Sequence, residues 1–308
     1  MANNELIDTN VSSNIEPYMF SKIYHHGPNC RKNLIQLLGK FTNSLSKNHI
    51  KKIYHMIKTN ISDHIIIDYI NKNKPIQKTK AMESKSRAIR IANIWYSFLT
   101  NTLKNKNLVM NVNEYLDIGC NNGIITVEFG KKFGLDNNCQ NQNQNRCQIH
   151  GIDVDFFTQQ QINPVAGFDF KTYDGYHIPY DDNFFDLITC SMVLHHIPHI
   201  NIILKEINRV TRLGGILLIK EHNSFSIYVE WLIYLEHLLY DVMDYGVSYD
   251  EFYKTYYQST FTTKTLTDLL KIFGFDLLEI SNNDFIKANH YSNPTKFFYA
   301  LYVKNRNS

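Results

Sequence analysis

The pattern of apolar and polar positions along the chain changes near residue 111. Beyond that point, short apolar runs alternate with segments whose apolar residues recur every three to four positions. The runs predict β-strands, which we expect at residues 114–118, 148–153, 165–170, 184–190, 216–219, 275–281 and 296–304. The intervening segments predict helices, expected at residues 124–133, 156–162, 200–213, 224–243 and 262–273. Such alternation is typical of an α/β domain built on a parallel sheet.

Before residue 111 only the helical period is present. Helices are expected at residues 31–38, 47–58, 61–71 and 84–104, with a loop or linker at 71–80. Residues 1–110 hold 17 Lys+Arg against 6 Asp+Glu, a net charge of +11, whereas the remainder holds 15 against 23, or −8. We expect a helical basic N-terminal segment over 1–110 and an α/β domain over 111–308 that carries a tyrosine-rich insertion at 244–261. The positive charge suggests nucleic-acid contact through residues 22–106, and solvated lysine-rich helix faces are the alternative explanation.

A glycine-containing turn follows the first expected strand. The sequence EYLDIGCNNG, residues 114–123, places Gly119 and Gly123 between that strand and a helix, as in the first half of a nucleotide-binding βαβ unit. Glycines there let a ligand approach the backbone at a helix N-terminus. Asp153 ends the second strand, where a carboxylate can accept hydrogen bonds from both hydroxyls of a ribose. The turn lacks the GxGxxG spacing of dinucleotide-binding dehydrogenases, which disfavours that class.

The order of the blocks resembles the class I S-adenosylmethionine (SAM)-dependent methyltransferases, especially the subgroup with a VLHH block. The resemblance covers residues 114–304 and rests on DIGCNNG, GID, Asp174-Gly175, FD, VLHH and the Gly214-Gly215 pair. It implies a doubly wound, seven-stranded, mostly parallel Rossmann-like sheet with an antiparallel last strand. It also implies SAM as cofactor, bound by Asp117, Gly119, Cys120, Gly123, Asp153, Asp174, Gly175 and Leu194.

By the same resemblance, the residues of the first turn surround the methionine part of SAM. Asp153 binds its ribose, Asp174 with Gly175 binds its adenine, and residues 191–194 lie beside the transferred methyl group. Asn121 stands where the family usually has a third glycine. Because Asn adopts left-handed backbone more readily than most residues, we expect the turn to survive this replacement.

Three histidines are candidates for proton transfer. His195 and His196 follow the fourth expected strand, and His222 follows the fifth. At these positions an imidazole could accept a proton from a substrate hydroxyl or amine, and packing or capping of the backbone is the alternative role. The histidines do not form an HExxH pattern, so we predict no catalytic metal.

Three functions remain open from the sequence. The first is methyl transfer from SAM to a small or medium-sized acceptor, which the VLHH block suggests. The second is RNA methylation at the cap or a base, which the basic segment and the tyrosine-rich insertion suggest. Ribose methylation is disfavoured because Ser191 stands where ribose 2′-O enzymes have a catalytic aspartate. The NPPY-type motif of adenine and amide methylation is also absent, since residues 190–193 read CSMV. The third is a catalytically silent scaffold subunit with the same fold, which the Asn121 replacement suggests.

The composition narrows the expected location of the protein. Five cysteines occur among 308 residues without a CxxC pair, which favours a reducing compartment and unpaired Cys139 and Cys147. The N-terminus lacks a secretion signal, and acidic residues and a histidine interrupt the apolar segment at 227–243, so neither secretion nor a membrane span is expected. We therefore expect a cytoplasmic protein. Frequent Asn, Lys and Ile indicate AT-rich coding, as in giant viruses and some protists, in which case the compartment is the host cytoplasm.

Overall fold

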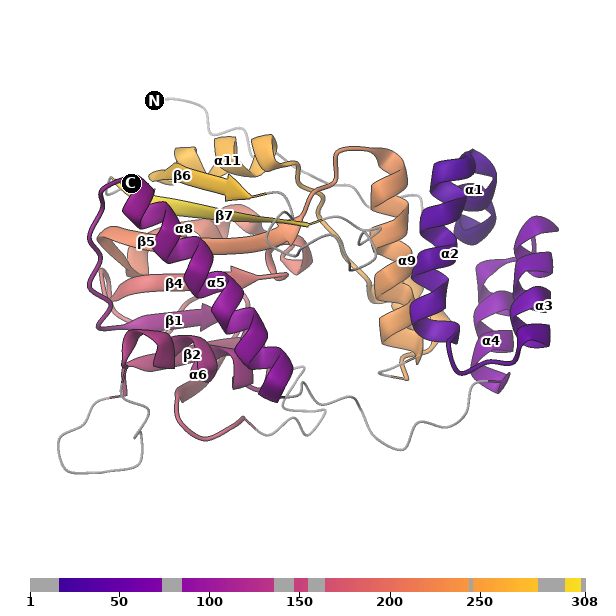
Figure 1. Ribbon diagram of the computed structural model, residues 1–308, viewed down its shortest axis with the longest axis horizontal. Coiled ribbons are helices and arrows are strands. Elements are labelled where there is room, and N and C mark those ends of the chain that lie inside the picture. Colours follow the sequence, from indigo (N-terminus) through magenta and orange to yellow (C-terminus); the bar gives the residue numbers. More distant parts are fainter. Residues whose placement is uncertain are drawn as a thin grey trace. The chain divides into compact units, whose positions relative to one another are not determined.

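The computed structural model describes residues 17–73, 85–135, 147–154, 164–243, 246–281 and 297–305 (Figure 1). The chain forms two compact units. The sheet unit is drawn from residues 81–223, 261–289 and 297–308, and the helical unit from residues 1–80, 224–260 and 290–296.

The sheet unit contains a seven-stranded mixed sheet, as the sequence predicts. Its strands are β1 (Tyr115–Ile118), β2 (Ile149–Val154), β3 (Asp169–Tyr173), β4 (Phe185–Ser191), β5 (Thr211–His222), β6 (Phe275–Ser281) and β7 (Phe297–Lys304). The strand order is β3-β2-β1-β4-β5-β7-β6 (Figure 1). Strands β1 to β5 run parallel, and β7 lies antiparallel to both β5 and β6. The C-terminal ends of the parallel strands therefore share one edge, where open α/β sheets bind ligands.

Helices cover the two faces of this sheet, and alternation along the strands supplies a core for each face. The helices of this unit are α5 (Lys85–Asn105), α6 (Ile124–Gly130), α8 (Ile200–Val210) and α11 (Thr263–Ile272), with short 3₁₀ turns η1 (Lys131–Phe133) and η2 (Leu194–His196). On β1, Leu116 and Ile118 join the core beneath α8 and α11. Tyr115 joins the opposite core, which α5 and α6 cover.

The helical unit combines N-terminal helices with a segment from the second half of the chain. Its helices are α1 (Met19–His26), α2 (Pro28–Thr42), α3 (Lys47–Lys58), α4 (Asp63–Asn73), α9 (Ile227–Met243) and α10 (Tyr249–Thr255). Phe20, Leu34 and Leu235 are buried in one shared core. Phe252 of α10, inside the tyrosine-rich segment 244–261, belongs to that same core. This division differs from the expected boundary at residue 110, because α5 packs on the sheet and residues 224–260 pack with the N-terminal helices.

Several predicted boundaries need correction. The third strand begins at Asp169 rather than at residue 165. The helix expected over 200–213 ends at Val210, because Thr211 already begins β5 and the strand continues through Gly214-Gly215. Helix α1 was not predicted. The helix expected at 156–162, the linker residues 74–80 and most of the polar tract at 136–148 lie outside the described residues.

Two further expectations concern membrane-spanning helices and the pairing of cysteines. Among the described residues, no helix combines the length and apolar character that crossing a membrane requires. Cys147 is disulfide-bonded, so the expectation that it is unpaired is wrong. Its partner lies outside the described residues, whereas Cys30, Cys120 and Cys190 are free thiols.

Candidate functional site

The turn between β1 and α6 has left-handed backbone at three positions. The φ angles are 70° at Gly119, 52° at Asn121 and 77° at Gly123. The Asn121 side-chain oxygen accepts a hydrogen bond from the amide of Asn122 over 2.7 Å, which holds the turn locally. Asn121 therefore takes the left-handed conformation that a third glycine would otherwise supply, as expected for this residue type.

Side chains of the protein itself account for the two glycines. A Cβ added to Gly119 would lie 2.2 Å from Cγ2 of Val193, and one added to Gly123 would lie 2.1 Å from the ring of Phe168. Left-handed backbone and close packing are thus sufficient to require glycine at both positions, whether or not a ligand approaches the turn.

Asp153 is a buried carboxylate at the C-terminal end of β2. Its side chain accepts the amide of Asn121 at Oδ2 over 2.6 Å and the amide of Val154 at Oδ1 over 2.8 Å. The residue is only 4% exposed. Burial raises the pKa of Asp153 to about 6, and the two amide hydrogen bonds oppose this rise. The carboxylate is thus fixed to the first turn and ionises near neutral pH.

Asp117 is buried inside the sheet unit rather than at an open surface. Its two carboxylate oxygens accept hydrogen bonds from Thr126 of α6 and Thr189 of β4, each over 2.6 Å. These contacts fasten α6 and β4 to β1. The thiol of Cys120 is also buried in this region. Burial, followed by the negative charges of Asp117 and Asp153, raises the pKa of this thiol well above its usual value, so it remains protonated.

The loop after β3 holds Asp174 through local contacts. Its Oδ1 accepts the amides of Tyr176 and His177, and its Oδ2 lies 2.7 Å from Nδ1 of His177. These hydrogen bonds, that of the His177 ring first, lower the pKa of Asp174 to about 2. Gly175 follows with a φ of 85°, and a Cβ there would meet only Cγ1 of Val154 at 3.8 Å. Both carboxylate oxygens of Asp174 thus bind groups of their own loop. The space beside the Gly175 backbone is nearly empty.

The three candidate histidines lie together at the ends of β4 and β5. Glu221, which is fully buried, accepts the His195 amide and the His222 amide, and its Oε1 lies 2.6 Å from Nδ1 of His195. The ring of His195 lies 4.0 Å from that of His196 and 5.0 Å from that of His222, centroid to centroid. His196 is exposed. The carboxylate of Glu221 therefore fixes the position of the His195 ring.

Comparison with known proteins identifies the family. A sequence profile described as "Methyltransferase domain" matches residues 64–280, which is more than half of the chain. The chain belongs to this methyltransferase domain family. The chain is also 29% identical over 100 residues to demethylmenaquinone methyltransferase of Lactobacillus johnsonii. That match spans 32% of the chain and 40% of the relative's length.

Solved structures resemble the chain at low sequence identity. A SAM-dependent methyltransferase from Mesorhizobium loti is 13% identical, with a TM-score of 0.45, and the match covers 68% of this chain and 97% of that one. A SAM-dependent methyltransferase from Aquifex aeolicus is 14% identical, with a TM-score of 0.42, over 72% of this chain and 100% of that one.

Asp153 lies at the end of β2, His195 and His196 lie after β4, and His222 ends β5, whereas Glu221 was not among the residues expected at the site. The signal was present, since an acid inside the apolar strand β5 must find partners when it is buried. Leu194, expected beside the transferred methyl group, is fully buried in the core beneath α8.

Proposed function

We propose that this methyltransferase takes its methyl group from SAM at the C-terminal edge of β1 and β2. Bound SAM would supply an electrophilic methyl group on a sulfonium. The observation that carries the proposal is the carboxylate of Asp153, which is buried at the end of β2 and joined to the glycine turn through the amide of Asn121. In this reading Asp153 binds the two ribose hydroxyls.

The donors and acceptors of this region fit that role. An ionised carboxylate has about four acceptor sites, and each oxygen of Asp153 accepts one amide in the structure. Each oxygen of Asp153 can therefore accept one further hydrogen bond, which is enough for two hydroxyl donors. We assign the backbone of Gly119, Cys120 and Gly123 to the methionine part. The open backbone at Gly175, with Asp174 beside it, is assigned to the adenine. Asp117 supports this region from within the sheet.

For the acceptor we infer a small or medium-sized molecule whose reacting atom carries a proton, as in the VLHH-type subgroup. The support is the pair of His195 and Glu221. A carboxylate at Nδ1 favours the tautomer that carries its proton on Nδ1, which would make Nε2 the basic atom of this ring, whose side chain is 2% exposed. His196 and His222 border this pair and would position the acceptor. A base held in place in this way contributes roughly 10²–10⁴-fold to a reaction that removes a proton.

Calorimetric titration with SAM and with S-adenosylhomocysteine tests the cofactor assignment. We expect both to bind, and Asp153→Asn to weaken binding at least about tenfold, because an amide cannot accept from both hydroxyls while keeping the two backbone contacts. Asp268→Asn removes an equal charge from an exposed position on α11 and should leave the affinity unchanged. Absence of binding to the wild type would favour the silent-scaffold alternative. Equal binding by the two variants would refute the ribose assignment.

RNA is the second candidate acceptor, and a specific surface favours it. Residues 17–73 hold 9 Lys+Arg against 2 Asp+Glu, or +7. Between α3 and α4 a groove of about 430 Å³ is lined by Lys52, Tyr69 and Lys72, and the Lys52 ammonium lies 4.7 Å from the centroid of the Tyr69 ring. The two lysines are exposed and Tyr69 is half-buried, and side chains of these types bind single-stranded nucleic acid by phosphate contacts and stacking.

Fluorescence anisotropy with a labelled single-stranded RNA tests this second candidate. Binding should weaken steeply between 50 and 200 mM salt, because phosphate contacts release counterions. Tyr69→Leu should weaken it further, whereas Tyr253→Leu, which changes a tyrosine on α10, should not. Binding that ignores both salt and Tyr69→Leu would exclude this groove as the RNA site.

A further inference from the structure

A cavity lies around the first half of the edge strand β3, and one of its wall residues, Phe168, packs against Gly123 of the glycine turn. It has a volume of about 710 Å³, within the range of small-molecule sites. His150 on β2 lines it, and His150 pairs with Asp169 in the sheet register. Asp153, the proposed ribose ligand, is three residues further along β2, or about 10 Å at 3.3 Å per residue. The cavity therefore belongs to the opposite half of these strands.

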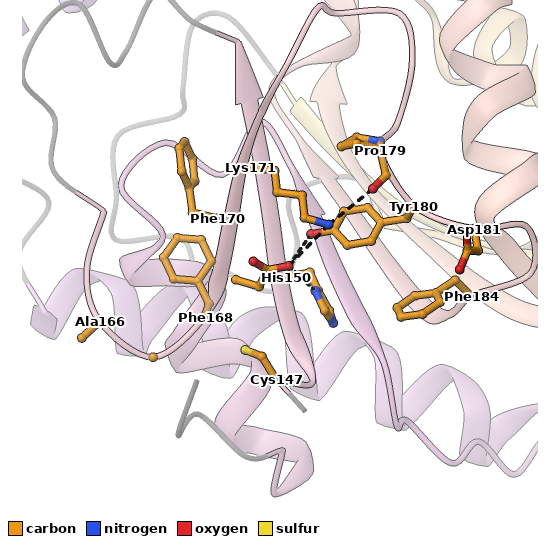
Figure 2. Close-up of a pocket in the computed structure, with 12 residues that line it drawn as sticks. Cys147, His150, Ala166, Phe168, Phe170, Lys171, Pro179, Tyr180, Asp181 and Phe184 are labelled. Atoms are coloured by element: carbon orange, nitrogen blue, oxygen red, sulfur yellow. Dashed lines mark hydrogen bonds and ion pairs between the residues drawn. The ribbon is translucent and has the colours of Figure 1, made fainter. Parts of the chain in front are cut away.

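Aromatic rings form much of the wall of this cavity (Figure 2). Phe168 and Phe170 lie on one side of β3, and Tyr180 and Phe184 lie on the other. The rings of Tyr180 and Phe184 are stacked, with centroids 5.8 Å apart and an interplanar angle of 29°. The ring of His150 meets that of Tyr180 edge-on at 5.2 Å. These rings offer flat apolar surfaces to the body of a ligand.

The wall that carries Tyr180 is fixed by an arginine from α8. The Arg209 guanidinium donates to the carbonyl oxygens of Tyr180 and Ile178, each over 2.8 Å. It also donates to Glu206 and Asp182. Five donors in a rigid fork hold this loop better than a single contact would. This loop is therefore held in place before any ligand binds, which lowers the entropy cost of binding.

The charged groups of the cavity are mainly acidic. Asp169 and Asp181 contribute two carboxylates to the lining, and Lys171 contributes one ammonium. Behind His150 lies a third carboxylate, since Oε2 of Glu114 is 2.9 Å from Nε2 of the histidine. Asp169 also accepts the hydroxyl of Tyr180 over 3.1 Å. His150 lies between two of these carboxylates, since its Nδ1 is 3.3 Å from Oδ2 of Asp169. The two carboxylates of the lining still outnumber its one lysine, which favours a cationic ligand over an anionic one.

An ammonium group of the protein already uses these contacts. Nζ of Lys171 lies 3.8 Å from the centroid of the Tyr180 ring, 3.7 Å from Oδ2 of Asp169 and 3.4 Å from the carbonyl oxygen of Pro179 (Figure 2). An aromatic face, a carboxylate and a carbonyl together are the groups that recognise an ammonium. The lysine side chain is 40% exposed, so its ion pair is weak and easily exchanged.

We propose that this cavity is a binding site for a small organic amine, recognised as a protonated primary ammonium on an apolar or aromatic body. Asp169 binds the ammonium, Tyr180 offers its ring face to the charge, and Phe184 contacts the body. Lys171 occupies the ammonium position in the absence of the amine and competes with it. The site does not depend on the proposed cofactor role of Asp153.

Calorimetric titration of the full-length protein at pH 7.5 with three probes of one shape tests this proposal. The probes are 2-phenylethylammonium, neutral 2-phenylethanol and anionic 3-phenylpropionate. We expect the ammonium to bind at least about tenfold more tightly than either of the others, because only it forms a charge-assisted hydrogen bond with Asp169. Absence of ammonium binding at 10 mM, or equal binding of 2-phenylethanol, would overturn the proposal.

Two variants sharpen the test. Asp169→Asn should weaken ammonium binding about tenfold or more. Lys171→Met removes the competing ammonium and keeps the apolar stem, so it should tighten binding by about two- to fivefold. Lys264→Met, at an exposed lysine on α11, is the matched control and should change nothing. Weaker binding by a folded Lys171→Met protein would contradict the proposal even if Asp169→Asn failed to fold. SAM affinity, measured in parallel, should be the same in all variants.

Discussion

The backbone amide of Asn121 donates a hydrogen bond to Oδ2 of Asp153 over 2.6 Å. This contact joins the left-handed turn after β1 to the acid that ends β2. Asn121, which replaces the usual third glycine, therefore binds through its backbone amide to the carboxylate that we assign to the ribose. Its side chain is turned to the amide of Asn122.

SAM affinity should depend on pH through Asp153. Burial raises the pKa of this carboxyl to about 6, and only the ionised form can accept both ribose hydroxyls. Affinity should be constant above about pH 7 and fall by roughly tenfold per unit well below pH 6. Calorimetric titrations between pH 5 and pH 8 measure this, with Asp153→Asn expected to show a flat, weak profile. A wild-type affinity that is constant down to pH 5 would contradict the assignment.

Substitution of Gly123 should destabilise the protein far more than substitution of Gly134. Both glycines have left-handed backbone, but a Cβ at Gly123 would meet the Phe168 ring at 2.1 Å, whereas one at Gly134 has nothing within 4 Å. We expect Gly123→Ala to lower the free energy of unfolding by about 3 kcal/mol or more, and Gly134→Ala by only about 1 kcal/mol. Urea unfolding measures both. Equal losses would show that packing against Phe168 does not matter.

The helical unit should become less stable as pH rises toward neutrality. Asp63 is fully buried and accepts the amides of Met19 and Phe20, yet desolvation raises its pKa to about 7. Because the folded-state pKa exceeds the unfolded value near 4, the stability that Asp63 contributes is complete below about pH 4. It is lost as pH rises through about 7, up to roughly 4 kcal/mol in all.

Tryptophan fluorescence can follow this effect in the helical unit alone. Trp231 lies in the helical unit and Trp95 in the sheet unit, so urea unfolding of a Trp95→Phe background reports on the former. Asp63→Asn should abolish most of the pH dependence between pH 4.5 and pH 8. Asp68→Asn, at an exposed position on the same helix, should retain it. Identical profiles for the two variants would refute the role of Asp63.

Glu221 should determine the tautomer of His195. With a carboxylate oxygen 2.6 Å from Nδ1, the neutral ring is expected to carry its proton on Nδ1. Nitrogen-15 chemical shifts of the imidazole measure this directly and need no acceptor. Glu221→Gln should lose the preference, because an amide can donate as well as accept. A ring protonated on Nε2 in the wild type would remove the basis for His195 as the base.

The sheet could be predicted from the sequence because each strand is an apolar run and each helix has a clear period. The error at Thr211 has a local cause. The sequence TRLGG resembles a helix end followed by a glycine stop, but pairing of Thr211 with Phe185 on β4 draws these residues into β5. Tertiary pairing thus overrode a local stop signal.

The helical unit could not be predicted because its contacts join distant parts of the chain. Lys40 on α2 and Glu236 on α9 form an ion pair over 2.6 Å although 196 residues separate them. No periodicity within either helix indicates its partner. The common location of the candidate site residues could be predicted more readily. Asp153 and the three histidines lie at or just after the C-terminal ends of parallel strands, and these ends meet at one edge of the sheet.

A crystal structure of the protein with S-adenosylhomocysteine tests the central claim most directly. We expect the nucleoside at the C-terminal edge of β1 and β2, with both ribose hydroxyls at hydrogen-bond distance from the carboxylate of Asp153. Density for the ligand at any other place, or ribose hydroxyls that contact other residues while Asp153 keeps only its two backbone amides, would contradict it.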